Sequence, residues 1–187
     1  MINFLSFDMF FWGQVVGFIA LLICVGKYQF KNTKTVMWIN AVACGFWIFH
    51  NLLLGGLTGA LMNSVAFFRN IICLKVKAHV RKSVFLVSLG VAGFLVLQHS
   101  SSLIDLLPFF GFFCFGLANV VYDRPLAMRL VCIAGDIFWL IYALSLFAIP
   151  LIITCFLGII SSVIGILRYE RDAVYNFLKI ISLRTYP

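Results

Sequence analysis

Charged residues are scarce in this sequence. Only 11% of its 187 residues are Asp, Glu, Lys or Arg, whereas 64% are hydrophobic. A soluble domain of this length needs more polar residues to cover its surface. The apolar runs are continuous and do not alternate with polar residues, which argues against a membrane β-barrel. The composition therefore predicts an all-α, polytopic membrane protein.

Basic residues are absent before the first apolar run. The leader "MINFLSFDMFFW" contains Asp8 and no Lys or Arg. A cleaved signal peptide needs a basic segment ahead of its apolar region. We therefore expect the first run to remain as a membrane span.

Motifs for catalysis or metal binding are also missing. The chain has no Gly-rich phosphate loop, no HExxH, no GxSxG and no pair of carboxylates at one membrane depth. Its six cysteines form no CxxC and no Cys/His cluster, which is typical of buried free thiols. We predict no enzyme activity, no disulfide, no metal and no cofactor.

Long apolar runs dominate the rest of the chain. A helix that crosses the hydrocarbon layer needs about 20 mostly apolar residues. We predict seven such spans, at roughly 9–26, 36–54, 57–74, 83–98, 103–121, 128–147 and 149–168.

Among the segments that connect the spans, only alternate ones carry basic residues. They occur in "KYQFKNTK", in "KVKAHVRK", at Arg124 and Arg129, and in the tail 169–187. With seven spans, all four segments lie on one face, and the positive-inside rule places that face in the cytoplasm and the N-terminus outside. This alternation explains the basic charge, so we predict the lipid bilayer as partner and no nucleic acid.

The two halves of the chain align at an offset of 92 residues. "FWIFHNLLLGG" falls on "FWLIYALSLFA", so that Trp47 corresponds to Trp139. The span positions agree in the same way. We predict a 3+1+3 architecture with parallel repeats, in which the units 9–74 and 103–168 flank a linker helix at 83–98, and the residues 169–187 form a cytoplasmic tail.

Two stretches carry a resemblance to a known family. "GQVVGFIALLICVGKYQFK" and "FHNLLLGGLTGALMNSVAFFRN" resemble the YgjV-type bacterial inner-membrane proteins. The resemblance implies the bacterial inner membrane and no settled activity. The layout is also similar to the SWEET, PQ-loop and PnuC-type small-solute carriers, although this chain has no Pro-Gln pair. A likeness of layout does not establish function.

Two opposite charges fall inside predicted spans. Arg69 and Asp136 both lie roughly 7–12 Å below the cytoplasmic boundary, at a rise of about 1.5 Å per residue. A lone charge in hydrocarbon is unfavourable by at least ~2.5 kcal/mol, which favours an ion pair. The alternative is that Arg69 extends to the lipid headgroups.

Polar residues mark two further positions. Asn63 and Asn70 share one helix face, which we expect to point into the bundle or a wet cavity, where Asn63 binds a solute or another helix. His50, Asn51 and Tyr142 lie near the outer side. They either line an outer vestibule, with His50 able to titrate, or His50 is hydrogen-bonded to water near the headgroups.

The leading functional hypothesis is passage of a small polar solute between the two units. The alternative is a structural or interaction subunit of a membrane complex, in which the polar residues join helices. Assembly into a homo-oligomer fits either hypothesis.

Overall fold

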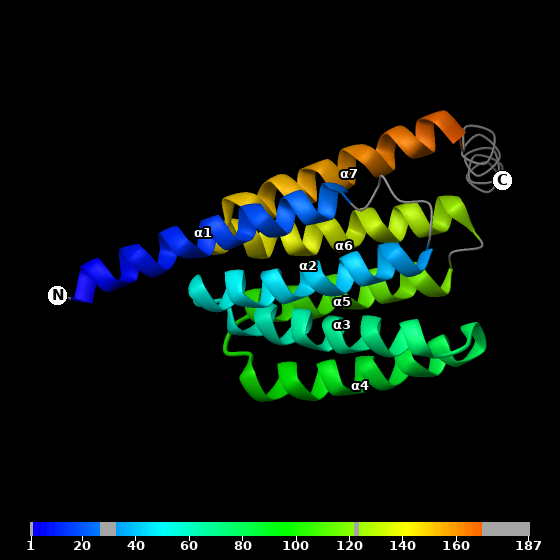
Figure 1. Ribbon diagram of the computed structural model, residues 1–187, viewed down its shortest axis with the longest axis horizontal. Helices are drawn as coiled ribbons and strands as arrows, with labels where there is room; N and C mark the ends of the chain where they lie inside the picture. Colours follow the sequence, from blue (N-terminus) through cyan, green and yellow to red (C-terminus); the bar gives the residue numbers. More distant parts are fainter. Residues whose placement is uncertain (1, 27–32, 122–123, 170–187) are drawn as a thin grey trace, which may run out of the picture.

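A computed structural model describes residues 2–26, 33–121 and 124–169 (Figure 1). These residues form seven α-helices and a short 3-10 turn at Ala78–Val80. Each predicted span coincides with one helix, because an unbroken apolar run is a local signal. The helices are α1 Ile2–Gly26, α2 Thr33–Leu53, α3 Leu57–Lys75, α4 Arg81–His99, α5 Leu103–Val120, α6 Pro125–Ser145 and α7 Ile149–Tyr169.

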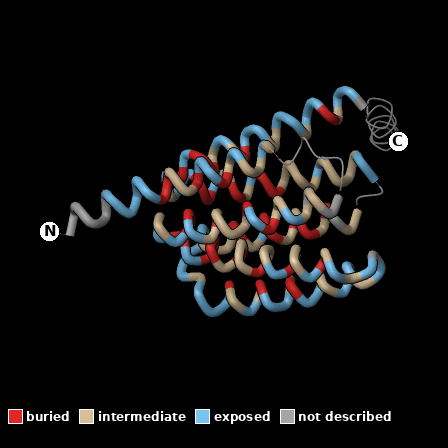
Figure 2. The backbone as a smooth tube through the Cα atoms, in the orientation of Figure 1, coloured by how far each residue is buried: buried red, intermediate tan, exposed pale blue. Residues whose placement is uncertain are grey.

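Five of these helices are long and apolar enough to cross a membrane. The qualifying stretches lie in α1, α3, α4, α6 and α7, whereas the apolar parts of α2 and α5 are shorter, at Met37–Leu53 and Leu103–Ala118. Large apolar side chains cover the outside of the bundle, and the buried residues lie on its inward faces (Figure 2). The predicted total of seven spans stays a prediction.

Six helices pack in a closed ring. The neighbours around it are α1, α2, α3, α5, α6 and α7, and α7 returns to α1. Helix α4 lies outside this ring, where it packs against α3 and α5 (Figure 1). Fully buried alanines, including Ala20, Ala43 and Ala143, let neighbouring helices approach closely.

Two turns at the same end of the bundle have the same backbone structure. Gly55 follows α2 with a φ of 78°, and Phe147 follows α6 with a φ of 52°. The next amide donates to Asn51 O at 2.7 Å in the first turn and to Ala143 O at 2.9 Å in the second. Both are Schellman motifs, which satisfy the last carbonyls of a helix. The paired residues are 92 positions apart.

The direction of successive helices alternates (Figure 1). The C-terminal ends of α1, α3, α5 and α7 therefore lie at one end of the bundle. We call this the basic end, because it carries the described residues Lys75, Lys77, Arg81, Lys82, Arg124 and Arg168. The two Schellman turns lie at the opposite end.

The turn after α2 requires a left-handed residue, and this can be tested. A Cβ added at Gly55 or at Gly90 meets nothing within 4 Å, so the two sites differ in backbone conformation alone. Gly55→Ala should lower the free energy of unfolding by about 1–2 kcal/mol. Gly90→Ala, in the middle of α4, should raise it by up to about 1 kcal/mol. Thermal unfolding in detergent measures both, and equal shifts would contradict the assignment.

Candidate functional site

A cavity of about 490 Å³ lies inside the ring. All six ring helices contribute to its lining, and among the described residues α4 contributes none. Polar and charged side chains on this lining come from α2, α3, α6 and α7, and they are Asn40, Asn63, Arg69, Asn70, Arg129, Asp136, Thr154, Ser161 and Ser162.

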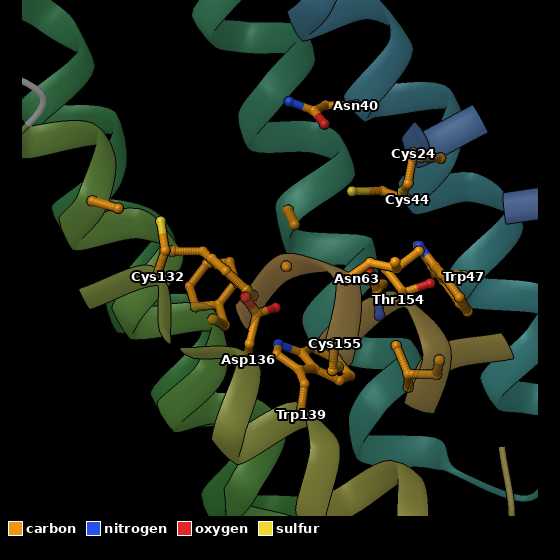
Figure 3. Close-up of a pocket in the computed structure, with 18 of the residues that line it drawn as sticks. Cys24, Asn40, Cys44, Trp47, Asn63, Cys132, Asp136, Trp139, Thr154 and Cys155 are labelled. Atoms are coloured by element: carbon orange, nitrogen blue, oxygen red, sulfur yellow. The ribbon is translucent and has the colours of Figure 1, made fainter. Parts of the chain in front are cut away.

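The cavity occupies the part of the bundle nearest the basic end. Deep in the bundle its lining includes Trp47, Met62 and Trp139, which are almost fully buried. Toward the basic end its lining includes exposed residues such as Val25 and Ser161. Figure 3 shows Asp136 and Trp139 on one side, facing Asn63 and Trp47 on the other. The site therefore combines aromatic walls with polar groups, as is typical of small-molecule sites.

Arg69 lies inside the bundle. Only 9% of the residue is exposed, and its guanidinium carbon is 4.6 Å from the centre of the Phe112 ring. Its Nη1 lies beside α5, where a Cβ added at Gly116 would come within 3.1 Å of it. Nη1 has no hydrogen-bond partner among the described residues. Phe112 of α5 thus packs its ring face against the Arg69 guanidinium, and Nη1 is left without a hydrogen bond to the described residues.

Asp136 lies on the same cavity but deeper. Helix α6 begins at Pro125, earlier than predicted, because proline fits the first turn of a helix. Asp136 is therefore about 16 Å from the start of α6, whereas Arg69 is about 9 Å from the end of α3. The carboxylate packs against α7, since a Cβ added at Gly158 would lie 2.5 Å from Oδ2. The Arg69–Asp136 ion pair stays a prediction.

Asn63 and Asn70 both line the cavity, as does Ala66 between them. The helix face expected from their spacing is thus turned toward the cavity. Asn63 Nδ2 donates to the Gly59 carbonyl of its own helix at 2.9 Å, and Asn70 Nδ2 lies 3.8 Å from Cys44 Sγ. One hydrogen of each amide is engaged, and the side chains have further hydrogen-bonding capacity.

His50, Asn51 and Tyr142 form a packed layer beyond the two tryptophans, which we call the closed layer. Their exposed fractions are 0%, 0% and 2%, so they do not line the open vestibule that we expected. His50 Nδ1 donates to the Gly13 carbonyl at 2.7 Å, and Tyr142 Oη accepts from the Gly59 amide at 3.1 Å. The burial of His50 also contradicts the alternative expectation that its side chain is hydrogen-bonded to water near the headgroups.

Glycines explain why the closed layer is so compact. A Cβ added at Gly17 would lie 2.5 Å from His50 Nδ1, and one at Gly59 would lie 2.6 Å from Asn51 Oδ1. Two buried polar atoms of the layer, His50 Nε2 and Asn51 Oδ1, have no hydrogen-bond partner among the described residues. Burying an unsatisfied polar atom is unfavourable by about 1–3 kcal/mol each. The closed layer therefore contains buried polar atoms that would gain hydrogen bonds if water reached them.

The structure adds three residues to the site that we did not select from the sequence. Arg129 was assigned to a cytoplasmic segment, but α6 starts early enough to carry it onto the cavity. Trp47 and Trp139 also line it. The alignment of Trp47 with Trp139 at the 92-residue offset was the sequence signal that could have identified them. The sequence does not show the cavity, so this alignment alone did not indicate a shared site.

Comparison with known proteins assigns a family but no activity. A family model described as "Bacterial inner membrane protein" matches residues 11–173 of the chain. No curated protein and no solved structure matches this chain.

The coupling of Arg69 and Asp136 can be measured by a double-mutant cycle. Removing one charge leaves the other without compensation in a low-dielectric cavity. Arg69→Gln should therefore destabilise the protein more in the native background than in Asp136→Asn, with a coupling of about 0.5–3 kcal/mol. Unfolding of the four proteins in detergent gives this value. Additive effects would show that the two groups do not interact.

Proposed function

We propose that this chain, which belongs to the Imp-YgjV family of bacterial inner membrane proteins, moves a small polar solute across that membrane. The path is the cavity between two three-helix units, α1–α3 and α5–α7, and α4 links them. The observation that carries this proposal is the convergence of polar and charged side chains on one cavity.

Convergence separates the two functional hypotheses. In a scaffold, intramembrane polar groups need only partners on neighbouring helices, so they can be scattered through the bundle. Here Asn63, Arg69 and Asp136, which come from two helices far apart in the sequence, line the same space. Polar groups that share a cavity in a membrane protein are typical of a substrate or ion path.

The cavity lining itself supports a repeat. Many of its residues occur in pairs 92 positions apart, on α2 with α6 and on α3 with α7. The pairs are Asn40 with Cys132, Cys44 with Asp136, Trp47 with Trp139, Met62 with Thr154, Asn63 with Cys155, Ala66 with Gly158, Arg69 with Ser161 and Asn70 with Ser162.

The order of helix packing agrees with this pairing. Moving each helix of the first unit onto its counterpart turns the α3–α5 contact into the α7–α1 contact, and both are present. The two Schellman turns match as well. An axis along the membrane normal would relate the two units, as in parallel-repeat transporters.

The distribution of charge supports one orientation of the path. The positive-inside rule favours the basic end in the cytoplasm and the N-terminus outside. The cavity then faces the cytoplasm, and the closed layer separates it from the outer side. Transport requires a second shape in which the layer opens and admits water to His50 Nε2 and Asn51 Oδ1. Thus His50, Asn51 and Tyr142 act as an outer gate rather than as a binding site.

The orientation of the cavity predicts a pattern of cysteine labelling. Cys44 lines the cavity, whereas Cys114 is buried in α5 away from it. In single-cysteine variants, a charged thiol reagent applied to the cytoplasmic face should modify Cys44 and leave Cys114 unmodified. Reagent applied to the outer face should label Cys44 much more slowly. Equal labelling from both faces, or none, would contradict the proposed orientation.

A ligand screen tests transport against the scaffold alternative. A solute at about 100 times its dissociation constant adds ~2.7 kcal/mol to the stability of the folded state. We expect at least one sugar, nucleoside, amino acid or vitamin to raise the unfolding temperature of the purified protein. Uptake of that compound into proteoliposomes then measures transport directly.

A matched pair of variants locates the site of any hit. Asn63 and Ser64 are adjacent, and each donates to a carbonyl one turn earlier at 2.9 Å, but Asn63 lines the cavity and Ser64 does not. Asn63→Ala should weaken the ligand effect, and Ser64→Ala should preserve it. A ligand effect lost equally in both variants would place binding elsewhere, and a screen without any hit would favour the interaction subunit.

A further inference from the structure

We infer that the cavity binds a small organic anion, whose carboxylate or phosphate group lies between Arg69 and Arg129. This inference rests on the proposed solute path and names the class of solute. It depends on the charge of the lining and on the incomplete hydrogen bonding of the two arginines.

The lining carries an excess of positive charge. Among the described residues of the cavity, two are arginines, Arg69 and Arg129, and one is an acid, Asp136. Even complete compensation by Asp136 leaves one guanidinium without a counter-charge among the described residues of the lining. Charges inside a membrane bundle are normally paired, because the hydrocarbon does not solvate them. A bound anion would supply the missing negative charge.

Both arginines have a buried nitrogen atom without an acceptor in the described part of the chain. Nη1 of Arg69 and Nε of Arg129 are inaccessible to solvent and make no hydrogen bond to the described residues. Gly165 of α7 makes room for the Arg129 guanidinium, because a Cβ there would collide with it. A Cβ at Gly116 of α5 would collide with the Phe85 ring and come within 3.1 Å of Arg69 Nη1.

The backbone positions of the two arginines lie at a similar height in the bundle. Arg69 is about 9 Å from the end of α3 and Arg129 about 6 Å from the start of α6, both measured from the basic end. Asn70 and Ser162, also on the lining, are near this height on α3 and α7. The planar donor fork of arginine matches carboxylate and phosphate oxygens in pairs. The anionic group therefore binds near the cytoplasmic mouth.

The deeper cavity suits the uncharged part of such a solute. Trp47 and Trp139 provide apolar surfaces there, and Asn63 provides an amide. Asp136 is about 16 Å from the basic end, where it disfavours a second negative charge. The cavity therefore favours a solute with its anionic group at one end.

A lipid headgroup is a second source of the same chemistry. A groove between α3 and α4, lined by Ser64, Ser83 and Ser88 among others, also reaches Arg69. A lipid phosphate in that groove would contact Arg69 but not Arg129, which is absent from its lining. The dependence on Arg129 therefore separates a solute in the cavity from a bound lipid.

The test compares charged probes with neutral ones of similar shape. The full chain, purified in an uncharged detergent, is titrated with benzoate against benzamide and with glycerol 3-phosphate against glycerol while its unfolding temperature is recorded. At least one anion should raise this temperature saturably, and its neutral counterpart should not. The apparent affinity should fall at least tenfold in Arg69→Gln and in Arg129→Gln, and Ser64→Ala should retain it.

The variants remain informative if Arg69→Gln fails to fold, because Arg129 is only partly buried and Arg129→Gln carries the same prediction. Loss of affinity in neither variant, or no effect of any anion, would overturn the inference. Stabilisation by phosphatidylglycerol nanodiscs alone, sensitive to Arg69→Gln but not to Arg129→Gln, would overturn it in favour of a lipid. Asn63-dependent binding of neutral solutes alone would also overturn it, while leaving the proposed transport intact.

Discussion

The central constraint on this protein is that its polar side chains have no solvent in the hydrocarbon layer. Every such group must find a partner, a wet space or the membrane surface. The closed ring of six helices meets this constraint by enclosing Arg69 and Asp136 together with the amides of α2 and α3. The exterior can then be almost wholly apolar. The cavity thus follows in part from the polar side chains that these helices carry, because those side chains must face inward.

The helices were predictable and their packing was not. Apolar runs are local, so the positions of all seven helices follow from hydropathy. The ring depends on the contact of α3 with α5 and of α7 with α1, which join segments distant in the sequence. The offset of 92 residues pointed to paired elements, but not to the cavity on which Trp47 and Trp139 meet.

The site was predicted in part for similar reasons. Spacing placed Asn63 and Asn70 on one face, because helical periodicity is fixed. The burial of His50 depends on Gly13 and Gly17 of another helix, so the sequence of α2 alone does not reveal it. Arg129 was missed because a shift of α6 by one turn moves a residue from a connecting segment into the bundle.

The closed layer has a further consequence for the two shapes that the proposed transport requires. Among the described residues, the direct hydrogen bonds that join the two units at this end include the bond from Gly59 to Tyr142 and the two bonds of Gln14, to Phe147 and from Ile149, at 2.9–3.1 Å. Each contributes about 0.5–1.5 kcal/mol, and hydration of the atoms left unsatisfied in the layer offsets part of that sum. A free-energy gap of a few kcal/mol between the closed and open shapes would leave the minor shape measurably populated. An outward-open form would then exist before any solute arrives, and the solute would select between shapes rather than create one.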